Sequence, residues 1–193
     1  FPRISSGATP EGWDYVAMGD NLAVLGFTMV LPVTGKSGIM AATFDASTRT
    51  WSSIEVITHP LEQGASWTRV AIDASGWALV SFFGGGSGFD LWTARHDPLL
   101  RRWAALQRPH RDVHVPHAGS IGPEGNALLV AGGPKGKGTS VARGLAGGTG
   151  NWLEVMKLHG SAWPEWLAAA HSLDARAIVV HAHPTAIYAL ARE

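Results

Sequence analysis

A short pattern recurs three times along this chain at a nearly constant interval. It consists of a ring-bearing or apolar residue, then Asp or Ala, a small residue or Pro, a four-residue spacer and Trp. The copies span residues 44–51, 96–103 and 145–152, and their Trp residues are 52 and 49 positions apart. A fixed period near fifty residues is typical of repeat architectures, in which each repeat is one supersecondary unit.

A second element precedes each Trp pattern and also appears once after the last one. It is a largely apolar run, a turn of three or four residues, and a second apolar run, at residues 13–27, 67–82, 116–133 and 167–183. Two apolar runs around a short Asp-, Gly- or Asn-containing turn are typical of a β-hairpin. The Trp pattern forms the turn between a third strand, c, and a further short apolar run after each Trp, strand d, so a unit holds four strands, a to d. Four strands per unit predict the blade of a β-propeller.

One segment also fits a helix. Residues 166–173 are rich in Ala and Leu, which are good helix formers. The same segment aligns with the first strand of the other three units. We therefore expect a strand there, with the helix as the alternative.

The glycines after strand b point to a family. Gly84-Gly85 stands ahead of His96-Asp97-Pro98 and Trp103, and Gly132-Gly133 stands ahead of Trp152. This arrangement resembles kelch-type propellers, although the first unit has Gly26-Phe27 instead of the double glycine. Similar repeats occur in sialidase-like propellers. The kelch resemblance implies a propeller fold and, commonly, a protein-binding role.

The strand count predicts how the fold closes. The repeats fall at about 13–57, 67–107, 116–157 and 167–193, and the last one lacks a strand d. Residues 1–5 can supply it, which gives an all-β, four-bladed propeller of four-stranded antiparallel blades in one domain, 1–193, closed by the N-terminal strand. The alternative is part of a larger propeller, or two chains that share one ring.

Composition excludes several classes of protein. The formal net charge is zero and the pI is about 7.3, so the basic surface of a nucleic-acid-binding protein is missing. There is no Cys for a disulfide or thiolate, and no apolar stretch approaches the roughly 18 residues of a membrane span. The start at Phe1 without Met is compatible with a removed leader and slightly favours a secreted or periplasmic location.

Loop length predicts which face binds a ligand. The a–b and c–d turns are short and uniform, whereas the d–a and b–c loops are long and dissimilar, and such loops tend to carry binding residues. Trp residues at repeated positions (Trp51, Trp103 and Trp152; Trp13 and Trp67) are expected to pack between blades. Ligand-binding candidates are Arg69, Arg111, Trp163 and Trp166.

Histidines gather beside the same loops. His181 and His183 are two apart on a strand and so share a face, and His114 and His117 lie where strand a of the neighbouring blade starts. These four are candidate ligands for zinc or copper, with binding that weakens as the pH falls through about 6.5. The alternative is that they are solvated or cap backbone groups.

Two functions follow from these patterns. The first is a binding module that holds a protein, small-molecule or carbohydrate ligand on the d–a/b–c face, with neither nucleic acid nor membrane as partner. The second is a metal-assisted enzyme, a small lyase or hydrolase, that uses the histidines. No catalytic motif chooses the second, so whether the chain is an enzyme stays open.

Overall fold

The computed structural model describes most of the chain in antiparallel β-strands. The described residues are 15–30, 35–58, 64–84, 89–132, 139–145, 151–159, 166–171, 176–183 and 186–192. Among them the one element other than a strand is a short 3-10 turn, η1 (Pro123–Gly125). The all-β prediction is confirmed.

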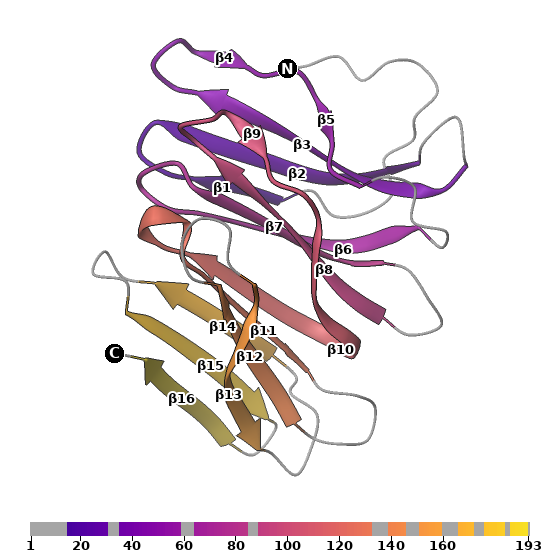
Figure 1. The fold of residues 1–193 in the computed structure, drawn as a ribbon, viewed down its shortest axis with the longest axis vertical. Coiled ribbons are helices and arrows are strands. Elements are labelled where there is room, and N and C mark those ends of the chain that lie inside the picture. The colour runs from indigo at the N-terminus through magenta and orange to yellow at the C-terminus, as the bar shows by residue number, and fades with distance from the viewer. Residues whose placement is uncertain are drawn as a thin grey trace.

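The strands form four layers, and along the longest axis of the molecule the strands of residues 15–103 lie in one half and most of those of residues 107–192 in the other (Figure 1). The first layer has the order β1-β2-β3-β4, with β5 paired to β3. Its strands are β1 (Tyr15–Met18), β2 (Leu22–Val30), β3 (Ser37–Asp45), β4 (Thr50–Trp51) and β5 (Glu55–Val56). The predicted hairpin of the first repeat is therefore β1–β2, with Met18 opposite Ala23.

The second and third layers are one continuous sheet, because they share β10. The order is β13-β12-β11-β10-β8-β7-β6, with β9 paired to β8. The strands are β6 (Ala65–Ile72), β7 (Ala78–Gly84), β8 (Phe89–Asp97), β9 (Arg102–Trp103), β10 (Gln107–Ile121), β11 (Ala127–Gly132), β12 (Thr139–Leu145) and β13 (Leu153–His159).

Strand β10 overturns one prediction. The segment between the second and third predicted repeats, residues 108–115, was expected to be one of the d–a loops, but the strand runs through it, pairing first with β8 and then with β11. Its two prolines, Pro109 and Pro116, lie inside the intervals where the register shifts, Gln107/His110 and His114/His117. Proline is tolerated in a sheet where no ladder hydrogen bond is required, as at a bulge. The prolines therefore mark bulges rather than a loop.

The fourth layer is a three-stranded sheet. It consists of β14 (Trp166–His171), β15 (Ala177–His183) and β16 (Ala186–Arg192). The strand prediction for this segment is confirmed over the helical alternative, because β14 pairs with β15 along its length. Residues 1–5 are outside the described part of the chain, so ring closure and the count of four blades stay predictions.

Apolar side chains fill each junction between layers, and each junction also holds a hydrogen-bonded polar pair, buried in the first two and partly buried in the third. The first junction packs Ile39 and Phe82, the second Leu79 and Leu129, and the third Val130 and Val179. The pairs are Thr28 Oγ1 to Thr68 Oγ1 at 3.2 Å, Ser81 Oγ to His117 Nε2 at 3.1 Å, and Ser120 Oγ to His171 Nδ1 at 2.8 Å. Paired in this way, the polar groups escape the cost of an unsatisfied buried hydroxyl.

The repeated Trp residues with described side chains have three different environments. Trp103 packs against the first junction and Trp152 is buried in the second, as predicted. Within its own layer, Trp51 packs on Phe44, with ring centroids 5.2 Å apart. Trp67 contradicts the prediction, because 52% of its surface is exposed. A bulge in β6 removes it from the packed position.

Candidate functional site

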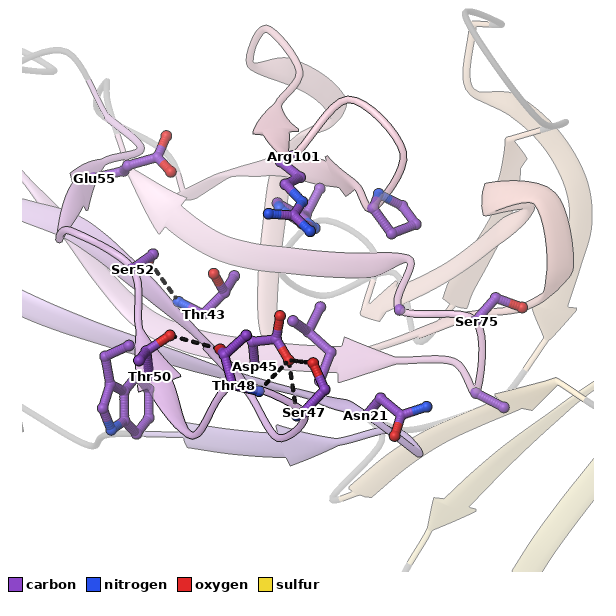
Figure 2. A pocket seen from close by; sticks show the side chains of 16 residues that line it. Asn21, Thr43, Asp45, Ser47, Thr48, Thr50, Ser52, Glu55, Ser75 and Arg101 are labelled. Atoms are coloured by element: carbon purple, nitrogen blue, oxygen red, sulfur yellow. Dashed lines mark hydrogen bonds between the residues drawn. The ribbon is translucent and has the colours of Figure 1, made fainter.

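A pocket of about 610 Å³ lies between the turns of the first and second layers. Figure 2 shows its wall of short polar side chains, with Arg101 facing Asp45 and Thr48 across the hollow. Six of the sixteen lining residues bear a hydroxyl: Thr43, Ser47, Thr48, Thr50, Ser52 and Ser75. We call the end of the sheets that carries this pocket the turn end, and the opposite end, where Ala65 and Phe89 lie, the loop end.

One wall is the turn between β3 and β4. The Asp45 carboxylate accepts hydrogen bonds at Oδ1 from the backbone N–H of Ser47 at 2.8 Å and of Thr48 at 3.3 Å, and from the Ser47 hydroxyl at 2.5 Å. Arg49 closes the turn in the left-handed region, with φ 56°. An Asp that binds its own turn in this way fixes the backbone locally.

The equivalent turn of the second layer is built by the same rule. Asp97 Oδ1 accepts from the N–H groups of Leu99 at 2.9 Å and Leu100 at 3.0 Å, and Arg101 has φ 50°. Arg101 thus occupies the repeat position of Arg49. The turn conformation, set by the repeated Asp, places its guanidinium in the pocket.

The floor between these turns depends on glycines. Gly19 lies so close to the Asp73 carbonyl oxygen that no side chain fits there. Gly76 has φ +90°, and a Cβ on it would lie 3.3 Å from Pro98 and 3.4 Å from Leu22. Positive φ and close backbone approach are the two conditions that favour glycine. They bring the β6–β7 turn against the first layer and close the pocket on that side.

Charge in the pocket is divided between opposing walls. Hydrogen bonds from Ser47 and from the backbone of Thr48, with a smaller contribution from the charge of Arg101, lower the pKa of Asp45. Asp45 is therefore a carboxylate at neutral pH. Arg101 opposes it across the hollow, and Glu55 adds a second acidic side chain to the lining.

His96 lines the pocket and is more polar than its counterpart in the first repeat. It stands where the first repeat has Phe44, and it packs on Trp103 at 5.2 Å, just as Phe44 packs on Trp51 at 5.2 Å. Burial lowers the pKa of His96, so the ring is neutral at pH 7. Its Nδ1 is buried and has no hydrogen-bond partner in the described part of the chain.

Of the four predicted ligand-binding residues, Arg69 and Arg111 have described side chains, and both lie on strands rather than in the pocket lining. Arg69 is half-buried on β6, where burial lowers its pKa, and Arg111 is exposed on β10. Trp163 is outside the described residues, and Trp166 begins β14, with its side chain outside the described part. These four residues therefore stay predictions for the loop end.

Of the four predicted metal ligands, His117 alone has a described side chain. It is buried, its ring meets Phe83 edge-on at 4.7 Å, and burial, helped by the charge of Arg69, lowers its pKa to about 3. For His114, His181 and His183 the structure gives backbone pairing only, and His181 and His183 do lie two apart on β15. No group of three or more potential ligands occurs among the described side chains. The zinc or copper site stays a prediction.

Loop length did not predict this pocket, because it favours the long d–a and b–c loops over the short, uniform turns as the binding face. The sequence holds a signal, since the first repeat has Ser47 and Thr48 where the second has Leu99 and Leu100. The turn scaffold is common to both repeats, but the hydroxyls belong to one. That difference marks the first turn as a candidate site.

Comparison with known proteins supports a propeller-like fold but assigns the chain to no family. No family model matches the chain, and no curated protein matches it. A polysaccharide lyase of family PL25, an ulvan lyase bound to -[GlcA(1-4)Rha3S]-, superposes with TM-score 0.58 at 12% identity, over 100% of this chain and 56% of its own. The NanB sialidase from Streptococcus pneumoniae gives TM-score 0.52 at 12% identity, over 87% of this chain and 28% of its own.

A third neighbour, TolB from Acinetobacter baumannii, gives TM-score 0.50 at 16% identity, over 97% of this chain and 41% of its own. All three are propeller-like, so this chain has a propeller-like fold that spans about half or less of each neighbour's length. Nothing in these comparisons is specific to kelch proteins. No described helix is long and apolar enough to cross a membrane.

Proposed function

We propose that this chain is a saccharide-binding propeller module whose ligand occupies the pocket at the turn end. The observation that carries the proposal is the lining, in which hydroxyls, a carboxylate and a guanidinium converge on a hollow of about 610 Å³. This volume is within the range of small-ligand pockets, about 300–1,000 Å³. A concave site of this size suits one or a few sugar units better than a flat protein surface.

The chemistry of the lining favours a polyhydroxylated ligand. Each sugar hydroxyl both donates and accepts. The Thr48 and Thr50 hydroxyls bond each other at 2.7 Å, which leaves the pair one donor and its remaining lone pairs for a ligand. Arg101 supplies only donors and Asp45 only acceptors, so the two together orient a ligand across the pocket. Two of the structural neighbours, the ulvan lyase and the sialidase, act on carbohydrates, which supports the same ligand class.

Binding fits the pocket better than catalysis. A general acid must hold a proton near working pH, whereas the lowered pKa of Asp45 keeps it ionised, and Oδ1 is already bound by its own turn. Both hydrogen-bonded Ser–His pairs of the described chain lie in the layer junctions, away from the pocket. The metal-assisted enzyme remains the alternative, with its histidines at the loop end.

Arg101 and Arg102 allow a matched test. Both lie at the β8–β9 turn and both are exposed, but only Arg101 lines the pocket. The measurement is affinity electrophoresis in gels that contain xylan, galactomannan or polygalacturonate. Loss of a charged hydrogen bond costs about 1.5–3 kcal/mol, so Arg101→Ala is expected to weaken retardation at least about tenfold. Arg102→Ala should behave as the wild type; equal behaviour of the two variants, or no retardation of the wild type in any gel, would refute the proposal.

A further inference from the structure

Trp67 combines two unfavourable properties. It lies on β6 with φ 57°, in the left-handed region, and 52% of its surface is exposed. The other non-glycine residues with positive φ in the described chain are Arg49, Arg101 and Glu124, all of them charged and in turns. Trp67 is the one apolar member of this group, and it stands in a strand.

The fold explains the bulge at this point. Ser66 pairs with Phe83 and Arg69 with Ser81, so Trp67 and Thr68 together oppose Phe82. The extra residue allows Thr68, which is 1% exposed, to turn into the first junction and bond Thr28 Oγ1 at 3.2 Å. A buried hydroxyl that gains a partner in this way stabilises the bulge.

The fold does not explain why the bulged residue is Trp. A left-handed conformation costs an ordinary side chain about 1–2 kcal/mol, and Gly or Asn adopts it more easily. An exposed indole also forgoes the burial that stabilises Trp103 and Trp152 in their clusters. Backbone strain retained without a packing benefit is a reason to look for function.

We propose that Trp67 is a stacking platform for a sugar ring at the loop end, separate from the pocket at the turn end. The bulge leaves about half of the Trp67 surface exposed, 52%, and a Trp side chain has only two dihedral angles to order when it binds a ligand. The apolar C–H face of a pyranose fits an indole, which also favours the ligand class proposed for the pocket. A polysaccharide that contacts both ends of the module gains avidity from the second site.

The test is Trp67→Asn, because Asn tolerates the left-handed backbone and removes the indole. In the same polysaccharide gels, the variant is expected to lose at least about tenfold in retardation while its melting temperature stays equal to the wild type or rises. Leu153→Asn, at another exposed apolar residue (67% exposed), is the matched control and should change nothing.

The result separates this proposal from the pocket. Unchanged retardation of Trp67→Asn beside a weakened Arg101→Ala would overturn the platform and leave the pocket standing. The reverse pattern would overturn the pocket and support the platform. A fall of several degrees in the melting temperature of Trp67→Asn would assign Trp67 a structural role instead, and a wild type that no gel retards would count against both.

Discussion

The two ends of the layers follow different rules. At the turn end, the Asp45 and Asp97 turns are each fixed by short-range hydrogen bonds within their own repeat. At the loop end, long-range pairing decides the structure, since β10 passes from one layer to the next and β6 bulges. In a turn whose backbone is fixed by its Asp, the other side chains can still contact a ligand. A short turn that repeats regularly along the chain can therefore also form a binding site.

The largest expected effect tests how tightly neighbouring layers pack at the turn end. In Gly125→Ala a Cβ would lie 2.7 Å from the Trp77 ring, at a residue with φ +76°. Arg95 also donates to the Gly125 carbonyl at 2.9 Å and lies over the same ring. Backbone strain and overpacking together predict a loss of about 3 kcal/mol in the free energy of unfolding, measured by urea denaturation.

Gly35→Ala is the matched control for this variant. Gly35 also has positive φ, 64°, but no atom lies within 4 Å of its added Cβ. It should lose only the backbone term, about 1 kcal/mol. Equal losses in the two variants would show that the turn end is not tightly packed.

The next effect tests whether water is excluded from the second junction, where His117 is buried. Burial lowers the pKa of His117 to about 3, whereas the unfolded chain protonates near 6.5. The unfolded state therefore binds more protons between these values, and the free energy of unfolding decreases as the pH falls from about 6.5 towards 3. At pH 4.5 the loss is about 2–3 kcal/mol for this residue.

Urea denaturation at pH 7 and pH 4.5 measures this loss. His117→Gln keeps a hydrogen-bonding group near Ser81 but cannot titrate. On acidification to pH 4.5, its free energy of unfolding should therefore fall by about 2–3 kcal/mol less than that of the wild type. The same pH dependence in both proteins would mean that His117 is hydrated and titrates normally.

A smaller effect concerns the pair that holds the β6 bulge. Thr28→Val leaves the Thr68 hydroxyl buried without its partner at 3.2 Å, which predicts a loss of about 1–2 kcal/mol. The double variant Thr28→Val/Thr68→Val removes both hydroxyls and should be closer to the wild type than the sum of the single variants. Strict additivity in denaturation midpoints would show that the hydroxyls do not interact.

Sequence alone predicted the local structure well. The hairpins β1–β2 and β14–β15 followed from apolar runs around short turns, because such pairing depends on neighbouring residues. The path of β10 did not follow, since a proline at a bulge and a proline in a loop look alike in sequence. The exposure of Trp67 did not follow either. It depends on the bulge at which Thr68 bonds the Thr28 hydroxyl, forty residues away in the sequence.

The site was harder to predict for the same reason. Thr48 and Ser75 belong to different repeats, and only the packing of two layers brings them to one pocket. The expected face was chosen by loop length, and much of it lies outside the described residues. Arg69, Arg111 and the four histidines therefore remain predictions for the loop end, beside the exposed Trp67.

Occupation of the turn-end pocket by a saccharide can be observed through amide NMR shifts during titration with an oligosaccharide from whichever polysaccharide retards the protein. We expect concentration-dependent shifts at Ser47, Thr48 and Ser75, which Arg101→Ala weakens and Arg102→Ala does not. Shifts confined to the loop end, around Trp67 and Arg111, with the three turn-end amides unmoved at saturation, would contradict this expectation.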